Sequence, residues 1–167
     1  FQRVCDLVEA NGCRARRYSL GDRFEQPNDI YVLDTIGQLM AFYSVGSVAF
    51  VGGTLAPSGG HSLIEPFGYS LPVICGPHTE KTRDVARSLL ERRALIQVQD
   101  ATELAQQISR LAANPGERLR LGATGRTYLN ESQGAVNRTL ALLNSLLETP
   151  IAEVVEARPK QLLHGER

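Results

Sequence analysis

Apolar residues recur along the chain in two patterns that predict different secondary structures. Apolar positions three or four residues apart predict a helix packed on one face, whereas short continuous apolar runs predict buried strands. The predicted strands are residues 13–18, 30–33, 48–51, 71–75 and 94–98. The predicted helices are an opening helix that ends at Asn11 and Gly12, residues 35–44, 62–69 and 79–93, one capped by Asp100, one containing Leu119 and Leu121, and one from Val136 to Leu147.

Strands and helices alternate over most of the chain, which is typical of an α/β fold with an open, mostly parallel sheet and helices on both faces. Within it, the helix at residues 35–44 is expected to turn Ile36, Leu39, Met40 and Tyr43 toward the core, because they share one helical face. The chain opens inside a helix and with Phe1 rather than Met, so we expect one domain over residues 1–149, truncated at its amino end. Charged residues dominate residues 150–167, which predicts a flexible tail.

Composition excludes several classes of function. The chain has 18 Lys and Arg against 18 Asp and Glu, and this balance disfavours nucleic acid as a partner. No apolar run is long enough to cross a bilayer, so the chain itself is expected to be soluble. Cys5, Cys13 and Cys75 lack the spacing of a disulfide framework or a zinc site and are expected to be reduced thiols.

Ligands of parallel α/β sheets bind outside the carboxyl ends of the strands, so the loops after Leu33, Val51 and Cys75 are the places to look for chemistry. In the first of these loops, Asp34 or Thr35 can cap the following helix. The free N–H groups of such a helix start can hold a phosphate, but an ordinary capped helix has the same sequence.

The second loop carries four glycines before a short helix, which allows close approach of the backbone to a ligand. Its spacing matches neither the dinucleotide fingerprint nor the phosphate loop, which disfavours a dehydrogenase or a P-loop ATPase. Glu65 has two interpretations at this point. It has capping-box spacing from Ser62, but the Pro66 that follows favours a carboxylate that points into the cleft and accepts hydrogen bonds from a ribose diol.

Two histidines lie at neighbouring strand ends. His61 follows the glycines and His78 follows the next strand, so both face the same edge, where each can be structural or can donate to a phosphate or sugar. Neither has the further ligands that a metal site needs, so no metal is expected. Lys81 can contact an anion, although a lysine at a helix start is more often solvated.

Taken together, these motifs resemble those of the 3-deoxy-D-manno-octulosonic acid (Kdo) transferases. The resemblance rests on residues 34–43 (DTIGQLMAFY), 48–53 (VAFVGG), 59–61 (GGH), 65–66 (EP), 72–73 (PV) and 76–79 (GPHT). It implies a GT-B glycosyltransferase, in which two Rossmann-like domains face each other across a cleft, and identifies this chain as the carboxyl-terminal, donor-binding domain. The implied donor is CMP-Kdo, and no cofactor is implied.

The resemblance also implies roles for individual residues. The amides around Gly37 and Gln38 would meet the phosphate or the sugar carboxylate of the donor, and Glu65 would bind the ribose hydroxyls, which favours its ligand role over capping. The residues implied to shape the pocket are Gly60, His61 and Ser62, with Thr35, Gly53 and His78 as further candidates.

The rest of the implied machinery lies outside this chain. The family's catalytic glutamate and membrane anchor belong to its amino-terminal domain, so this chain is expected to hold no catalytic residue and to be inactive alone. Through that domain, the parent protein would meet its acceptor, a lipid A precursor, at the cytoplasmic face of the bacterial inner membrane during lipopolysaccharide synthesis.

The sequence departs from the family pattern at three places. Gln38 stands where the family usually has Glu, Ser62 where it has Asn, and Glu80 and Lys81 where it has Phe and Asn. Backbone contacts at residues 37 and 38 would survive the first change, but the second removes an amide donor and acceptor. Two alternatives therefore stay open: a GT-B domain for another nucleotide sugar, such as a UDP-sugar, and a non-catalytic interaction domain on the same fold.

Overall fold

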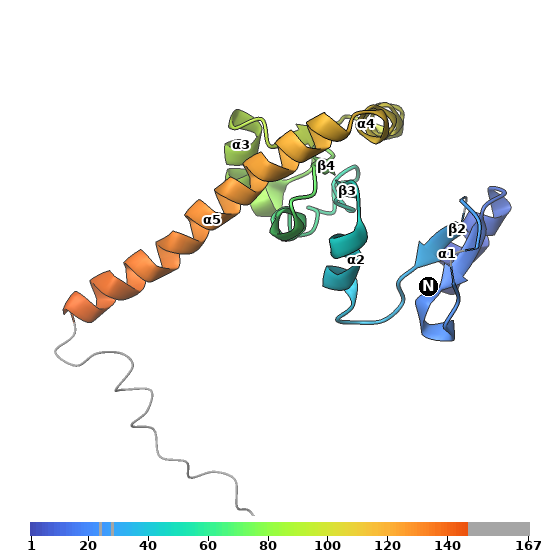
Figure 1. Ribbon diagram of the computed structural model, residues 1–167, viewed down its shortest axis with the longest axis horizontal. Coiled ribbons are helices and arrows are strands. Elements are labelled where there is room, and N and C mark those ends of the chain that lie inside the picture. The colour runs from blue at the N-terminus through green and yellow to red at the C-terminus, as the bar shows by residue number, and fades with distance from the viewer. Residues whose placement is uncertain (24, 28, 147–167) are drawn as a thin grey trace, which may run out of the picture.

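The computed structural model describes residues 1–23, 25–27 and 29–146 of the chain (Figure 1). Its α-helices are α1 (Gln2–Ala10), α2 (Leu39–Val45), α3 (Arg83–Glu91), α4 (Ala101–Ala113) and α5 (Pro115–Leu146). Its short 3₁₀ helices are η1 (Tyr18–Leu20), η2 (Glu65–Tyr69) and η3 (Glu80–Thr82), and its strands are β1 (Arg14–Arg17), β2 (Asp29–Val32), β3 (Ala49–Phe50), β4 (Val73–Cys75) and β5 (Leu95–Gln97). Each described strand pair is parallel, which confirms the α/β fold class.

The strands are divided between two small sheets rather than joined in one. One sheet pairs β1 with β2, and the other has the order β3-β4-β5. The first sheet, with α1 and η1, forms an amino-terminal unit (residues 1–34), and the second belongs to a main body (residues 46–132) (Figure 1). Between them lies α2. Strand positions could be predicted from apolar runs, but the division between sheets could not, because it depends on pairing between distant segments.

The main body is built around β4, the central strand of its sheet. Val73, Ile74 and Cys75 are all fully buried, as expected for a strand with packing on both faces. Phe67 of η2 and Leu89 of α3 are also fully buried in the same core. The apolar run at residues 71–75 was therefore interpreted correctly as a buried strand.

In the amino-terminal unit, charged groups replace much of this apolar core. Asp29 is buried and accepts hydrogen bonds from Arg14 Nε (2.8 Å), Glu25 N (2.7 Å) and Gln26 N (3.1 Å). These hydrogen bonds hold the pKa of Asp29 well below its usual range, and the bond from Arg14 has the largest effect. Ile30, expected inside a buried strand, is exposed, although Val32 two residues further along β2 is buried.

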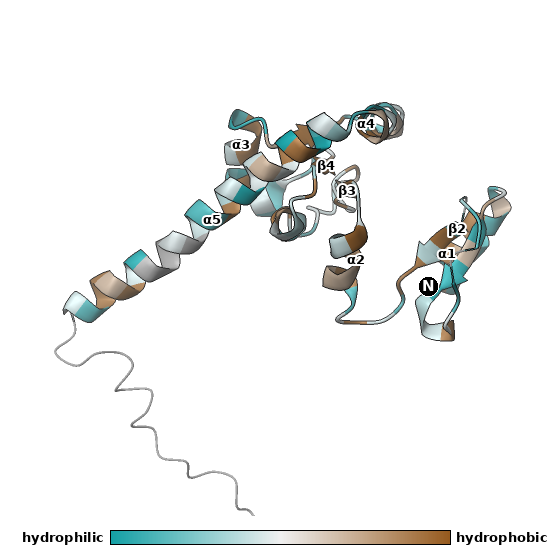
Figure 2. Ribbon diagram, in the orientation of Figure 1, coloured by the Kyte–Doolittle hydropathy of each residue, from teal (hydrophilic) through white to brown (hydrophobic). Residues whose placement is uncertain are grey.

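The prediction for the helix at residues 35–44 was partly wrong. The helix begins at Leu39, Ile36 is fully exposed before it, and Leu39 and Met40 face solvent, so only Tyr43 of the expected face packs on the core. Figure 2 shows the brown, apolar colouring of α2 between the two parts of the molecule. The helical period identified an apolar face, but the position of η2 decided which of its residues find a partner.

Phe42 connects α2 to the amino-terminal unit. Its ring lies 5.8 Å from that of Tyr18 and 5.6 Å from that of Tyr31, measured between centroids. The ring of the next residue, Tyr43, lies 6.4 Å from that of Tyr69 of the main body. The short helix α2 therefore joins the two parts through adjacent aromatic residues.

The predicted break between α4 and α5 is present, but the two helices expected after it are one. Asp100 caps α4 as predicted, since its side chain accepts from Glu103 N (2.8 Å), and Asn114 caps the start of α5 by accepting from Glu117 N (3.0 Å). From Pro115, α5 runs without interruption to Leu146 and extends beyond the main body (Figure 1). The expected tail at residues 150–167 lies outside the described residues.

Two glycines let α5 pack closely against η2. A Cβ atom at Gly122 would overlap the carbonyl of Ser70, and one at Gly125 would overlap the ring of Phe67. Arg126 of α5 also donates to the carbonyl of Gly68. The 3₁₀ helix that begins with Glu65 is thus held firmly between α5 and the core. Over the described residues, no helix is both long and apolar enough to cross a membrane.

Candidate ligand site at the carboxyl ends of β3 and β4

The loop after β3, which we call the glycine loop (residues 52–60), is a compact turn. Gly53, Gly59 and Gly60 have φ angles of 75°, 82° and 68°, in the left-handed region that favours glycine. The amide of Gly60 donates to the carbonyl of Gly53 (2.9 Å), which closes the loop on itself. The density of glycine in this segment is therefore partly a requirement of its backbone.

Lys81 and Ser58 complete the closure of the glycine loop. Ser58 Oγ donates to the carbonyl of Gly53 (2.9 Å), and Lys81 Nζ donates to the carbonyl of Ser58 (2.9 Å). The aliphatic part of Lys81 covers Gly59. Lys81 is thus placed at the loop rather than left fully solvated.

Thr54 attaches the glycine loop to the end of β4. Its hydroxyl donates to the carbonyl of Val51 (2.6 Å) and accepts from the amide of Gly76 (2.7 Å), while its carbonyl accepts from the amide of His78 (2.9 Å). Sequence reasoning missed this residue. A hydroxyl side chain directly after a strand and two glycines was the available signal, but nothing in the sequence reveals that residue 54 meets residues 76 and 78.

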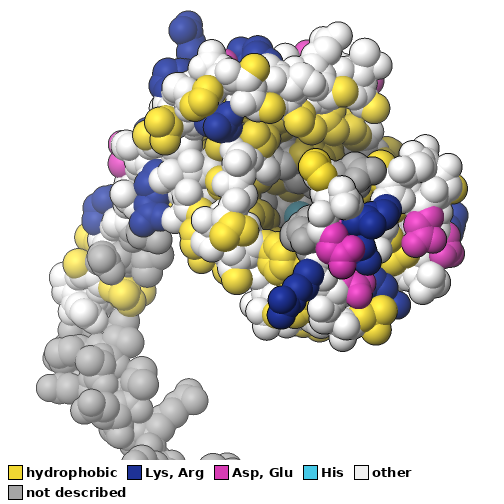
Figure 3. Space-filling view, turned by 45° about the vertical axis from the view of Figure 1, so that its right-hand side comes forward, with side chains coloured by type: hydrophobic (Ala, Val, Ile, Leu, Met, Phe, Trp, Pro, Cys, Tyr) yellow, Lys and Arg dark blue, Asp and Glu magenta, His cyan; other side chains and the backbone are white. Residues whose placement is uncertain are grey.

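The two histidines lie at the same edge, as predicted, but in different settings. His78 is half-buried, and its Nδ1 lies 3.3 Å from Glu80 Oε1. The pKa of Glu80 is lowered, chiefly by a hydrogen bond from its own backbone amide and then by His78. His61 is exposed and has no hydrogen-bond partner among the described residues. In Figure 3 a histidine side chain, in cyan, is visible between the main body and the amino-terminal unit.

Glu65 is the first residue of η2 and is exposed. The helix has Ile64 as its N-cap residue and no side-chain capping bond, so the capping interpretation of Ser62 and Glu65 was wrong. Within the described part of the chain, the carboxylate of Glu65 has no hydrogen bond or ion pair. The nearby Tyr43 has a raised pKa, caused first by burial and then by the charge of Glu65. A positioned carboxylate is thus free to accept hydrogen bonds from a ligand.

The loop after β2 differs from the expectation. Asp34 does not cap α2 but accepts from Ser19 Oγ (2.6 Å), Ser19 N (2.9 Å) and Arg17 Nε (2.8 Å). These bonds, the one from the Ser19 hydroxyl foremost, lower the pKa of Asp34 to about 2. The sequence could not show that the side chain turns back toward η1 instead of forward to the helix.

Thr35, Gly37 and Gln38 are exposed residues between Asp34 and α2. Gly37 has a φ of 91° and open space where a Cβ would stand. Gln38 is the N-cap residue of α2, without a side-chain bond. The structure thus brings Gly53, Gly60 and His78 together through Thr54, whereas no hydrogen bond within the described ranges joins residues 35–38 to the glycine loop.

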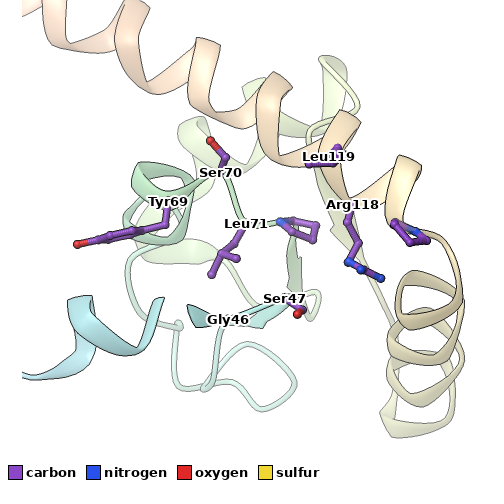
Figure 4. A pocket seen from close by; sticks show the side chains of 9 residues that line it. Gly46, Ser47, Tyr69, Ser70, Leu71, Arg118 and Leu119 are labelled. Carbon is purple, nitrogen blue, oxygen red and sulfur yellow. The ribbon is translucent and has the colours of Figure 1, made fainter. Parts of the chain in front are cut away.

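A pocket of about 350 Å³ lies at the opposite edge of the sheet, before β3 and β4 (Figure 4). It is lined by Gly46, Ser47, Tyr69, Ser70, Leu71, Pro72, Pro115, Arg118 and Leu119. The guanidinium of Arg118 donates hydrogen bonds to two carbonyls near the end of α4, those of Leu111 (2.6 Å) and Ala112 (2.9 Å). This pocket is therefore separate from the predicted ligand edge.

No group of three His, Cys, Asp or Glu residues that could hold a metal ion occurs in residues 1–23, 25–27 and 29–146. The three cysteines are unpaired. Burial raises the pKa of the Cys75 thiol to about 11, so it stays protonated at neutral pH.

A parallel α/β fold with a glycine-rich loop and polar groups at the carboxyl ends of its strands defines the Rossmann-like class of ligand-binding domains. Within this class, the chain resembles the C-terminal CMP-Kdo binding domain of WaaA from Acinetobacter baumannii, with a TM-score of 0.73 and 26% identity over 77% of this chain and 67% of that one.

Curated relatives agree with this structural match. The chain is 33% identical to the 3-deoxy-D-manno-octulosonic acid transferase of Haemophilus influenzae over 89% of its length, and 32% identical to that of Bordetella pertussis over 88%. Over most of its length the chain is therefore similar to part of the 3-deoxy-D-manno-octulosonic acid transferases. The chain spans 35% of the length of each of these two relatives. No family model matches it.

Proposed function

We propose that this chain is the donor-binding domain of a Kdo transferase, formed by residues 1–149, and that it binds CMP-Kdo. The observation that carries the proposal is the similarity to the CMP-Kdo binding domain of WaaA, which extends to 26% of the aligned sequence as well as to the fold. The unpartnered carboxylate of Glu65 and the backbone turn of the glycine loop, both at the ligand edge of a parallel sheet, support the same reading.

In this proposal Glu65 recognises the ribose. An ionised carboxylate accepts hydrogen bonds only, so it pairs with the two hydroxyl donors of a vicinal diol. Its place on η2, which α5 and the core hold in position, fixes the backbone from which the carboxylate extends. Gly53, Gly60, His61, Ser62 and His78 would surround the nucleotide.

The phosphate or the Kdo carboxylate would meet the backbone around residues 37 and 38, next to Thr35. The left-handed turn at Gly37 and the open space beside it leave these amides accessible. This part of the proposal has residues 35–38 and the glycine loop contact the same donor.

The parent protein would transfer Kdo to a lipid A precursor in lipopolysaccharide synthesis, at the cytoplasmic face of the bacterial inner membrane. The base that deprotonates the acceptor hydroxyl, and the contact with the membrane, would belong to an amino-terminal domain outside this chain. The chain alone would then bind donor without turnover.

Titration of the chain with CMP, UMP and UDP tests the donor. We expect CMP to bind most tightly and to shift the amide signals near Gly37 and Glu65. Tighter binding of UDP would overturn the CMP-Kdo assignment in favour of a domain for a UDP-sugar. Binding of none of the three would favour a non-catalytic interaction domain.

Glu65→Gln tests the ribose contact. The amide keeps the size of the side chain but loses a charged acceptor, so we expect CMP to bind about tenfold more weakly, since a hydrogen bond to a charged group contributes roughly 1.5–3 kcal/mol. Glu91→Gln on the exposed face of α3 is the matched control and should leave the affinity unchanged. Equal affinity of the Glu65 variant and the parent chain would contradict the assigned role.

A further inference from the structure

Thr54 is a buried polar side chain at the centre of the candidate site, with 1% of its surface exposed. It follows β3 directly after Gly52 and Gly53, and it faces the residues that follow β4. Its hydroxyl is used in both directions, as donor to the carbonyl of Val51 and as acceptor from the amide of Gly76. No apolar side chain of the same shape can make either bond.

The backbone and methyl group of Thr54 also explain why two nearby residues are glycines. A Cβ atom at Gly76 would overlap the carbonyl of Thr54, and a Cβ atom at Gly60 would lie 2.5 Å from Thr54 Cγ2. Gly60 and Gly76 therefore leave room for this one residue. The carbonyl of Thr54 then accepts from the amide of His78.

We propose that Thr54 is a positioning residue that holds the glycine loop and residues 76–78 at the separation that the nucleotide requires. This inference rests on the proposed function above. Thr54 acts through Gly60, Gly76 and His78, because its own side chain is buried beneath them. Without the hydroxyl, the buried amide of Gly76 loses its acceptor, and the two segments separate to let water reach it.

Thr54→Val and Thr54→Ser test the hydroxyl. Valine keeps the shape but loses both hydrogen bonds, so we expect CMP to bind about tenfold more weakly to this variant. Serine keeps the hydroxyl and should restore the affinity to within about threefold of the parent. Thr124→Val on α5, which loses a hydrogen bond to the carbonyl of Arg120, is the matched control and should bind as the parent does.

Amide hydrogen exchange separates this inference from the proposed function. In Thr54→Val the amides of Gly76 and His78 should exchange at least tenfold faster, with or without nucleotide, and those of α4 should not change. Unchanged exchange, or faster exchange with unchanged CMP affinity, would overturn the positioning role. If the parent chain binds no nucleotide, the proposed function fails, while the exchange result still decides whether Thr54 holds the segments together.

A double-mutant cycle covers the case in which Thr54→Val does not fold. Gly60→Ala places a methyl against Thr54 Cγ2, and Thr54→Ser removes that atom. We expect the double variant to bind CMP more tightly than Gly60→Ala alone, despite the left-handed backbone at residue 60. Additive effects of the two changes would show that Thr54 does not set the position of the loop.

Discussion

The amino-terminal unit and the main body are stabilised by different forces. In the main body, β4 and η2 bury a continuous apolar core that includes Phe67 and Val73. In the amino-terminal unit, only Cys5, Asp29 and Val32 are buried among the described residues. Its order depends on ion pairs and on side chains that bond to the backbone. The main body therefore gains most of its stability from the hydrophobic effect, and the unit depends on electrostatics that respond to pH and salt.

In Figure 3 the lobe at the right carries neighbouring dark blue and magenta side chains at its surface. The ion pairs of this unit include Arg14 with Glu25 and Asp29, Arg16 with Glu25 and Asp29, and Arg17 with Asp34. The candidate site combines the glycine loop, which belongs to the main body, with residues 35–38, which follow the amino-terminal unit. These two segments are thus attached to parts of the molecule that are stabilised differently.

The largest expected effect is that of Phe67→Ala in the main body. The side chain is fully buried and packs against Gly125, so its removal leaves a cavity that should cost about 3–5 kcal/mol of unfolding free energy. Denaturant unfolding followed by circular dichroism measures this cost. Leu7→Ala, at an exposed position of the amino-terminal unit, is the control and should change stability by no more than about 0.5 kcal/mol. Similar losses for both variants would contradict the proposed difference between the two parts.

The next effect is the response to acid. The pKa values of Asp29 and Asp34 are lowered in the folded chain, so their contribution to stability is complete above the ordinary carboxyl pKa and is lost as the pH falls through the folded values, about 2 for Asp34. Below about pH 4, the ordinary carboxyl pKa, the amino-terminal unit should therefore begin to unfold before the main body does. Amide spectra recorded between pH 6 and pH 2 check the order, and loss of the main body first would contradict it.

A smaller effect is expected where α2 joins the two parts. Phe42→Ala removes ring contacts with Tyr18 and Tyr31, and each such aromatic pair contributes about 0.5–1.5 kcal/mol. Amide exchange should become faster in the amino-terminal unit and stay unchanged in the main body. Val45→Ala, at the exposed end of the same helix, is the control. Equal changes in both parts would show that α2 does not connect them through Phe42.

The smallest difference between the two parts is expected in the reactivity of two buried cysteines. Cys5 in the amino-terminal unit and Cys75 in the main body are both buried, so each reacts with a thiol reagent only when its surroundings open. We expect Cys5 to be labelled faster, because it lies outside the hydrophobic core clusters of the main body, whereas Cys75 belongs to one of them. Mass spectrometry of peptides after timed alkylation measures both rates, and Cys13, which is half-buried, provides the upper reference. Faster labelling of Cys75 would reverse the comparison.

Much of the fold could be predicted from local patterns. The apolar run at β4, the Asp100 cap and the break before Pro115 were all correct, because each depends on residues close together in the chain. Predictions that needed distant partners were less accurate. Asp34 or Thr35 was expected to cap α2, but Asp34 bonds to Ser19 and Gln38 is the N-cap residue. Ile36 was expected in the core but faces solvent.

The candidate site shows the same limit. The glycine loop, His61, His78 and Glu65 were identified from the sequence, since turn residues and strand ends can be recognised locally. Spacing alone left capping and a free carboxylate open at Glu65, and the resemblance favoured the ligand role; the structure shows no side-chain cap at the start of η2. The roles of Gly37 and Gln38 in donor binding remain predictions.

By itself, the sequence determined the alternation of strands and helices, the positions of the glycines and the resemblance to Kdo transferases, because these are properties of residue order. The tertiary structure alone decided that Thr54 meets Gly76, that the strands form two sheets and that α5 is one helix closing over η2. The physical reason is that hydrogen bonds and close packing between segments far apart in sequence follow from the folded arrangement, which no local pattern encodes.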